Sequence, residues 1–178
     1  MIKIIQIILL IANIVIIISC ENSTEPENEK DINDIYEIVL RDKFMNNSSG
    51  YDSKNDEIIK IYFIGLYEEI DSNYDFKGSL IDPEEDLIKK FNGYRKEIKK
   101  VSQSQTEGNW GNYQIKDNET NEKGMIFILG PIKRITDNEI EIEAGYCLGP
   151  FPNECETYRL KKEGHIWQIS YKKYRWIT

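Results

Sequence analysis

The sequence of 178 residues has little histidine and little cysteine, on which many metal sites and nucleophilic sites depend. It contains one histidine, His165, and three cysteines, and no further histidine or cysteine stands at ligand spacing from them. The eleven glycines are scattered, so no glycine-rich phosphate loop is formed. These absences predict no metal, no cofactor and no catalytic site, and we expect His165 to be a solvated turn residue.

Basic residues are outnumbered as well. The 31 acidic and 23 basic side chains give a net charge of −8 at pH 7. An acidic chain repels phosphate backbones, which argues against a nucleic-acid partner and against electrostatic binding to anionic lipid. Hydrophobic residues make up 40% of the chain, enough at this length for the core of one domain.

The long apolar run lies at the start of the chain. Lys3 precedes an apolar segment over 4–18, which ends at Ser19 and Cys20. About 15 residues of helix span roughly 22 Å, which is short of the hydrocarbon core of a bilayer. A positive start, an apolar middle and a small residue at the end are typical of an export signal.

The tetrapeptide Ile17-Ile18-Ser19-Cys20 resembles the lipobox of bacterial lipoproteins. The resemblance implies cleavage before Cys20, a diacylglycerol on its sulfur and a further acyl chain, such as palmitate, on its amino group. Two or three chains anchor a protein stably, whereas one binds marginally. An uncleaved membrane anchor is the alternative, and the absence of a following lysine and arginine cluster disfavours it.

The lipobox resemblance divides the chain into three parts. We expect a signal peptide over 1–19, a lipid anchor with a flexible tether over 20–34, and a single domain over 35–178. The tether is rich in Glu, Asn, Ser and Thr and has too few apolar side chains to offset the entropy of ordering. The predicted location is the bacterial cell envelope, facing the periplasm or the exterior, with the membrane as a partner through the anchor.

Periodicity predicts the elements of the domain. Apolar residues at helical spacing indicate a helix over 32–45. Asp82 is expected to cap a second helix that ends near Gly93. Dense β-branched and aromatic residues predict strands over 58–67, 96–102 and 125–129. The polar stretch over 103–124 is interpreted as a functional loop or a poorly ordered segment.

The last third of the chain predicts two successive hairpins. Apolar and acidic residues alternate over 140–148, the chain turns at 149–153 and returns over 155–161, and a final strand follows Glu163-Gly164 over 166–178. These strands predict an α+β fold, in which an antiparallel meander of four or more strands packs on one or two helices.

Cys147 and Cys155 suggest a register for the first hairpin. If they face each other, Glu143 lies opposite Arg159, and apolar residues pair on the other face. In the same register Glu141 lies opposite Lys161. An exported protein meets oxidising conditions, so we expect a Cys147–Cys155 disulfide, which contributes about 2–3 kcal/mol in the chain-entropy model. Two free thiols are the alternative.

The end of the chain also resembles a set of small exported bacterial proteins of uncharacterised role. The match rests on a tyrosine-and-leucine strand, a glycine turn, a W-x-[IV] strand and a terminal W-I-[ST], here Tyr158, Leu160, Gly164, Trp167, Ile169 and Trp176-Ile177-Thr178. The resemblance implies a fold and no activity. A weaker likeness is to cystatin-like rolls, in which a curved meander wraps a helix.

Three functions are compatible with these features. The first is a lipid-anchored binding or interaction module without catalytic activity, with Trp110 and Tyr113 as candidate contacts for a protein or small-molecule partner. The second is an inhibitor or immunity-type protein that neutralises a basic partner. The third is an envelope hydrolase using carboxylates, for which Glu141 and Glu143 are available unless neighbouring cations neutralise them.

Overall fold

The computed structural model divides the chain into two units, residues 1–30 and 31–178, and the sheet belongs to the second. It describes residues 29–50, 59–67, 69–70, 76–77, 79–108, 113–148 and 152–177. The predicted signal peptide and Cys20 therefore lie outside the described residues. No helix within the described ranges is long and apolar enough to cross a membrane.

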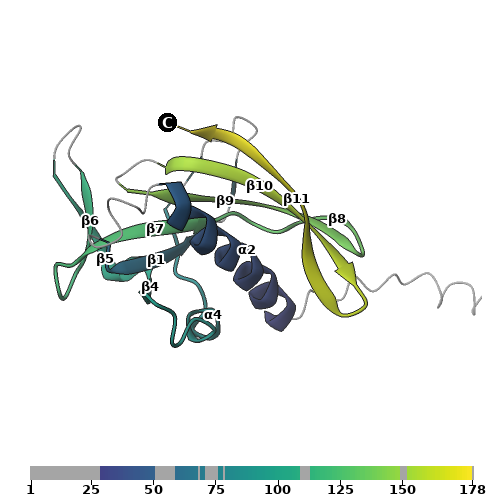
Figure 1. Cartoon of the computed structure of the whole chain (residues 1–178), viewed down its shortest axis with the longest axis horizontal. Helices are drawn as coiled ribbons and strands as arrows, with labels where there is room; N and C mark the ends of the chain where they lie inside the picture. The colour runs from purple at the N-terminus through teal and green to yellow at the C-terminus, as the bar shows by residue number, and fades with distance from the viewer. Residues whose placement is uncertain are drawn as a thin grey trace, which may run out of the picture. The chain divides into compact units, whose positions relative to one another are not determined.

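Nine strands of the described residues form one mixed sheet, in which neighbours along the main path follow the order β11–β10–β9–β7–β1–β4 (Figure 1). Strand β5 pairs with β6, β6 also pairs with β7, and β8 pairs with β9. The strands are β1 (Ile61–Leu66), β4 (Glu97–Lys100), β5 (Ser104–Glu107), β6 (Gln114–Asp117), β7 (Lys123–Leu129), β8 (Lys133–Thr136), β9 (Glu139–Cys147), β10 (Pro152–Glu163) and β11 (Ile166–Ile177). A separate ribbon pairs β2 (Glu69–Ile70) with β3 (Phe76–Lys77).

The predicted α+β fold is confirmed, with one addition. Strands β7, β9, β10 and β11 are antiparallel neighbours, as the meander requires. Strand β1, however, runs parallel to both β4 and β7. A parallel pair needs a crossover connection, and the chain between β1 and β4 supplies one that includes the short helix α4 (Glu85–Lys89).

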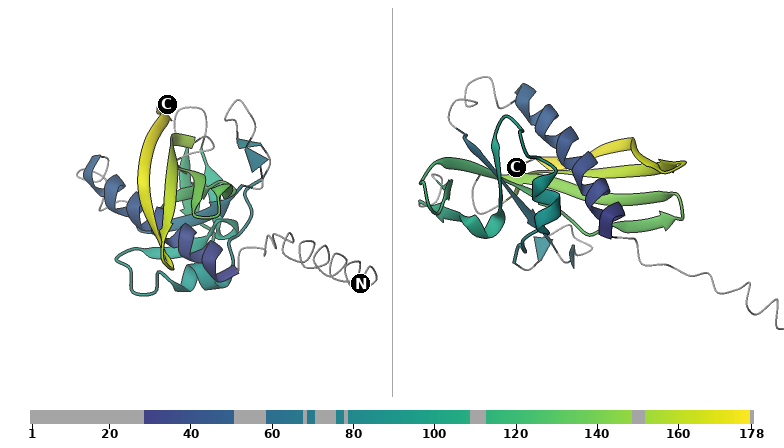
Figure 2. Two further views of the ribbon diagram at one scale, coloured as in Figure 1. Left: turned by 90° about the vertical axis from the view of Figure 1, so that its right-hand side faces the viewer. Right: turned by 90° about the horizontal axis from the view of Figure 1, so that it is seen from below.

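The long helix α2 (Glu29–Gly50) covers one face of the sheet and confirms the predicted helix at 32–45. Four of its apolar side chains, which recur at helical spacing on one side of the helix, are completely buried. They meet Leu87 and Phe91 from the region of α4 and the inward residues of β1, β7, β9 and β10 in one core cluster. Helices α2 and α4 lie on the same side of the sheet (Figure 2). The buried residues of α2 are Ile35, Val39, Leu40 and Phe44.

The second helix is shorter than expected and is not capped by Asp82. Helix α4 spans five residues, and the side chain at its N-cap, Glu84, makes no capping hydrogen bond. Asp82 instead accepts hydrogen bonds from the backbone N–H and the hydroxyl of Ser102, at 2.9 and 2.7 Å. The helix also ends earlier than expected, at Lys89, although Gly93 has a φ of +83°, in the left-handed region.

The polar stretch over 103–124 contains strands, so its interpretation as a loop is wrong where the structure describes it. Strands β5 and β6 form a hairpin, and β6 also pairs with β7, which adds the hairpin to the sheet. A buried carboxylate, that of Asp117, holds the following turn. It accepts a hydrogen bond from the ammonium of Lys99 at 2.6 Å. It also accepts hydrogen bonds from the backbone N–H groups of Glu119 and Thr120, both at 2.9 Å. These donors hold the pKa of Asp117 at about 2, below its ordinary value of 3.8, with the Lys99 hydrogen bond as the largest cause.

The register of the β9–β10 hairpin differs from the prediction by two residues, which leaves every side chain of these two strands on its expected face. Arg159 lies opposite Glu141 rather than Glu143, and Cys155 lies opposite Gly145 rather than Cys147. Glycine is needed at 145, because a side chain there would collide with the carbonyl oxygen of Glu154. The final turn is formed by Gly164 and the exposed His165, with a φ of +64° at Gly164.

Replacing Asp117 by asparagine should lower the free energy of unfolding by about 2–4 kcal/mol, because the ammonium of Lys99 loses its buried partner. Urea denaturation measures the change. Glu107→Gln is the control: it breaks an exposed ion pair with Lys116 and should cost less than about 1 kcal/mol.

The variant Asp117→Asn should also change how the free energy of unfolding depends on pH in the acid range. The folded pKa of Asp117 is about 2 and its ordinary value is 3.8, so its contribution is complete above pH 4 and is lost as the pH falls toward 2. Asp117→Asn should lack this part of the pH dependence. An unchanged acid profile would contradict the role given to the carboxylate.

Candidate functional site

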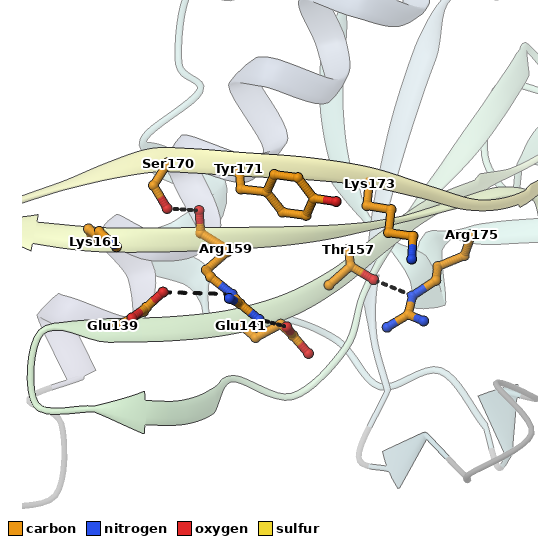
Figure 3. A pocket seen from close by; sticks show the side chains of 9 residues that line it. All are labelled: Glu139, Glu141, Thr157, Arg159, Lys161, Ser170, Tyr171, Lys173 and Arg175. Atoms are coloured by element: carbon orange, nitrogen blue, oxygen red, sulfur yellow. Dashed lines mark hydrogen bonds and ion pairs between the residues drawn. The ribbon is translucent and has the colours of Figure 1, made fainter.

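The face of β9, β10 and β11 opposite α2 carries an open concavity of about 550 Å³ (Figure 3). This volume lies within the range of roughly 300–1,000 Å³ that is usual for ligand pockets. We call this surface the open face. Its lining residues are Glu139, Glu141, Thr157, Arg159, Lys161, Ser170, Tyr171, Lys173 and Arg175.

Strand alternation places the β9 and β10 residues on the open face. Even-numbered residues such as Ile142 and Tyr158 are buried toward α2, and odd-numbered ones such as Glu141 and Arg159 point the other way. The cross-strand pair Arg159 and Glu141 therefore falls in the middle of the concavity.

Two bulges in β11 bring its side chains to the same surface. One extra residue, Ser170, shifts the pairing between Leu160–Ile169 and Arg159–Tyr171. In a regular strand Ser170 would pair with Arg159, and Tyr171 would share the helix-facing side of Ile169, because residues two apart share a face. The Ser170 hydroxyl donates to the carbonyl of Arg159 at 3.0 Å.

The second bulge, at Arg175, supplies a cation at the far end of the concavity. The Arg175 Nε donates to the Thr157 hydroxyl at 2.6 Å and lies 3.9 Å from the carboxylate of Glu143. Bulges re-aim side chains in this way. Both extra residues of β11 therefore line the candidate site (Figure 3).

Arg159 is the central group of the open face. Its Nη2 donates to Glu141 at 3.1 Å, and its Nε lies 3.7 Å from Glu139, too far for a hydrogen bond. The Nε is buried and has no hydrogen-bond partner among the described residues, while the side chain as a whole is 42% exposed. Such an unsatisfied donor is unusual in a folded protein. This buried atom is out of reach of a ligand, but the exposed part of the guanidinium has N–H groups besides the one that it donates to Glu141.

Lys161 and Lys173 make no ion pair with any described residue, although both are exposed on the open face. The predicted pairing of Lys161 with Glu141 is wrong, because Arg159 occupies that carboxylate. The lining has four cations against two carboxylates, in a chain whose net charge is −8. The open face is thus locally cationic.

Glu143, at the margin of the open face, has a raised pKa. Burial is the main cause, Glu141 adds to it, and the guanidinium of Arg175 opposes it. The side chain of Glu143 is 13% exposed. A partly buried carboxylate with a raised pKa beside a second carboxylate is the arrangement that acid catalysis uses.

The other face of the same strands holds a buried polar cluster against α2. The ammonium of Lys43, 1% exposed, lies 2.5 Å from Glu154 and 2.6 Å from Glu156. The Tyr158 hydroxyl lies 2.8 Å from Glu156 and 2.9 Å from Asp42. Burial and these two carboxylates raise the pKa of Tyr158. The cluster fixes β10 to the helix.

The two cysteines of the domain are buried free thiols in this structure. They lie on one face but diagonally, since Cys155 is opposite Gly145. Diagonal neighbours are about 7 Å apart, beyond the reach of a disulfide. Burial raises the pKa of each thiol to about 12, and Glu143 adds to this for Cys155. The disulfide stays a prediction, and its formation would require the shifted register.

Of the residues singled out from the sequence, Glu141 lines the concavity, whereas neither candidate aromatic contact is among its described lining residues. Trp110 lies outside the described residues, and Tyr113 is half-buried and does not line the concavity. The residues of β11 were missed because the bulge at Ser170 reverses their expected faces. The alternation of Trp167, Ile169 and Tyr171 continues through Ser170, so the sequence carries no signal of the bulge at that point.

No family model, no curated protein and no solved structure matches this chain. The likeness of its end to small exported bacterial proteins, and the weaker likeness to cystatin-like rolls, therefore stay predictions. The open face is the basis on which a function can be assigned.

The thiols should be unreactive in the folded protein. With a pKa of about 12, the thiolate fraction at pH 7.5 is on the order of 10⁻⁵, so iodoacetamide should not label Cys147 or Cys155 in native protein purified without reductant. In urea both should be labelled, as peptide mass spectrometry can show. Labelling in urea only after reduction would instead establish the disulfide and the shifted register.

Proposed function

We propose that this chain is a lipid-anchored protein of the bacterial cell envelope that binds an anionic ligand on the open face. The single observation that carries the binding proposal is the locally cationic concavity of an acidic protein. Lys161 and Lys173 are exposed there and make no ion pair with the described part of the chain, and the partly exposed guanidinium of Arg159 has N–H groups besides the one bonded to Glu141.

The anchor part of the proposal is supported by the sequence. The lipobox at 17–20 and the acidic tether would hold the domain away from the bilayer, where a ligand of the envelope can reach the open face. Repulsion between the acidic chain and anionic lipid would act in the same direction.

The charge of the open face suits an anion better than a basic protein. An inhibitor of a basic partner needs a carboxylate-rich contact surface, and this concavity has a surplus of cations. Charge-assisted hydrogen bonds from lysine and arginine to carboxylate or phosphate are roughly twice as strong as neutral ones. The inhibitor alternative gains no support from this surface.

The double variant Lys161→Ala/Lys173→Ala should weaken binding of inorganic tripolyphosphate about tenfold or more in isothermal titration calorimetry. Lys60→Ala/Lys123→Ala is the matched control, since it removes two exposed lysines outside the concavity with the same change in net charge. Equal binding by the two double variants would refute the open face as the anion site.

Cys20→Ala should abolish labelling of the protein by a fatty-acid probe in the native cell and release it from the membrane fraction. Cys147→Ala and Cys155→Ala are the controls and should keep both properties. Persistent labelling of the Cys20 variant would show that the anchor assignment is wrong.

A carboxylate hydrolase is the second candidate, and one observation favours it. Glu143 has a raised pKa through burial, and Glu141 lies two residues away on the same face of β9. Residues at this spacing in a strand have Cα atoms about 6.5 Å apart. Release of products from a saccharide by the wild-type chain, but not by Glu143→Gln, would establish this activity.

A further inference from the structure

We infer that the ligand of the open face is an extended acidic saccharide, a sugar chain that carries carboxylates at intervals. This inference rests on the proposed anion-binding function and names the class of ligand. It follows from four properties of the surface: its mixed charge, the spacing of its lysines, an exposed aromatic ring and an interrupted strand edge.

The mixed charge of the open face disfavours a densely charged polyanion. Glu139 and Glu141 lie on β9 beside Arg159, so a ligand with a negative charge on every unit would meet these carboxylates as well as the cations. A sugar hydroxyl both donates and accepts hydrogen bonds. Hydroxyl groups can therefore donate to the glutamates and accept from the guanidinium.

The two unpaired lysines are separated along the sheet. Lys173 is the cross-strand partner of Thr157, which is four residues from Lys161 on β10. At the usual rise of a strand this places the two positions about 13 Å apart. A ligand that pairs with both lysines where they stand is therefore extended, and its charges are spaced along it.

Tyr171 supplies an exposed aromatic ring, with which a small inorganic anion makes no favourable contact. Its side chain is 53% exposed, lies directly opposite Arg159 and occupies the strand between Ser170 and Lys173 (Figure 3). The face of an aromatic ring offers apolar contact to the C–H groups of a sugar ring, and the neighbouring polar side chains can bind its hydroxyls. Exposed aromatic rings are frequent anchors of recognition.

An acidic peptide fits this surface less well. Extended peptides bind sheets by adding a strand to an edge through regular backbone hydrogen bonds. Strand β11 ends the main path of the sheet, and its bulges at Ser170 and Arg175 interrupt that regularity. The favoured ligand therefore lies across the side chains of the open face rather than along the edge.

Calorimetric titration of the full chain, purified in a polyoxyethylene detergent that contains no sugar, tests the inference. Tetragalacturonate should bind about tenfold or more tightly than tetraglutamate, which has the same number of side-group carboxylates, and than neutral cellotetraose. Tyr171→Ala should weaken tetragalacturonate binding about tenfold. Tyr171→Phe should retain the preference for the saccharide.

Tyr174→Ala is the matched control, because Tyr174 is a similarly exposed tyrosine of the same strand whose pairing with Glu156 places it on the helix side. It should bind tetragalacturonate as the wild type does, with equal melting temperatures confirming that each variant is folded. Equal affinity for tetraglutamate, or no effect of Tyr171→Ala, would overturn the inference. Anion binding that still depends on Lys161 and Lys173 would then leave the proposed function standing.

Discussion

The buried ammonium of Lys43 determines where the outer strands lie on helix α2. A charge removed from water without a partner costs several kcal/mol, and Lys43 is 1% exposed. Two carboxylates of β10, from Glu154 and Glu156, meet it at 2.5 and 2.6 Å. The hydroxyl of Tyr158 contacts Asp42 one residue earlier on the helix. These contacts hold β10 with its even-numbered residues toward α2 and leave its odd-numbered residues on the open face.

The division of faces explains how an acidic chain presents a cationic surface. The apolar and the buried charged side chains of β10 pack against the helix, so Arg159 and Lys161 lie on the opposite side of the strand. The bulge at Ser170 then adds Lys173 and Tyr171 to that side and turns Lys172 toward Asp42, 2.8 Å away. Local charge is thus set by the arrangement of the strands, which the net charge of −8 does not reveal.

The predicted register failed because two registers satisfy the same local rules. Strand β9 repeats glutamate at 139, 141 and 143, so a slip of two residues keeps Arg159 opposite a glutamate and keeps every side chain on its face. Alternation therefore predicts the faces and does not select the partner. The close approach of Gly145 to Glu154 and the contacts of β10 with α2 are long-range features that distinguish the two.

The long helix, most of the strands and the inward side of β9 and β10 can be predicted from the amino-acid sequence, because they follow from hydrophobic periodicity along a short stretch. The sequence is also the sole basis for the proposed anchor at Cys20. The pairing register, the parallel position of β1 and the surface to which Tyr171 and Lys173 belong depend on contacts between distant segments. The reason is physical: one extra residue at Ser170 reverses a face, and the packing of distant segments fixes where it is accommodated.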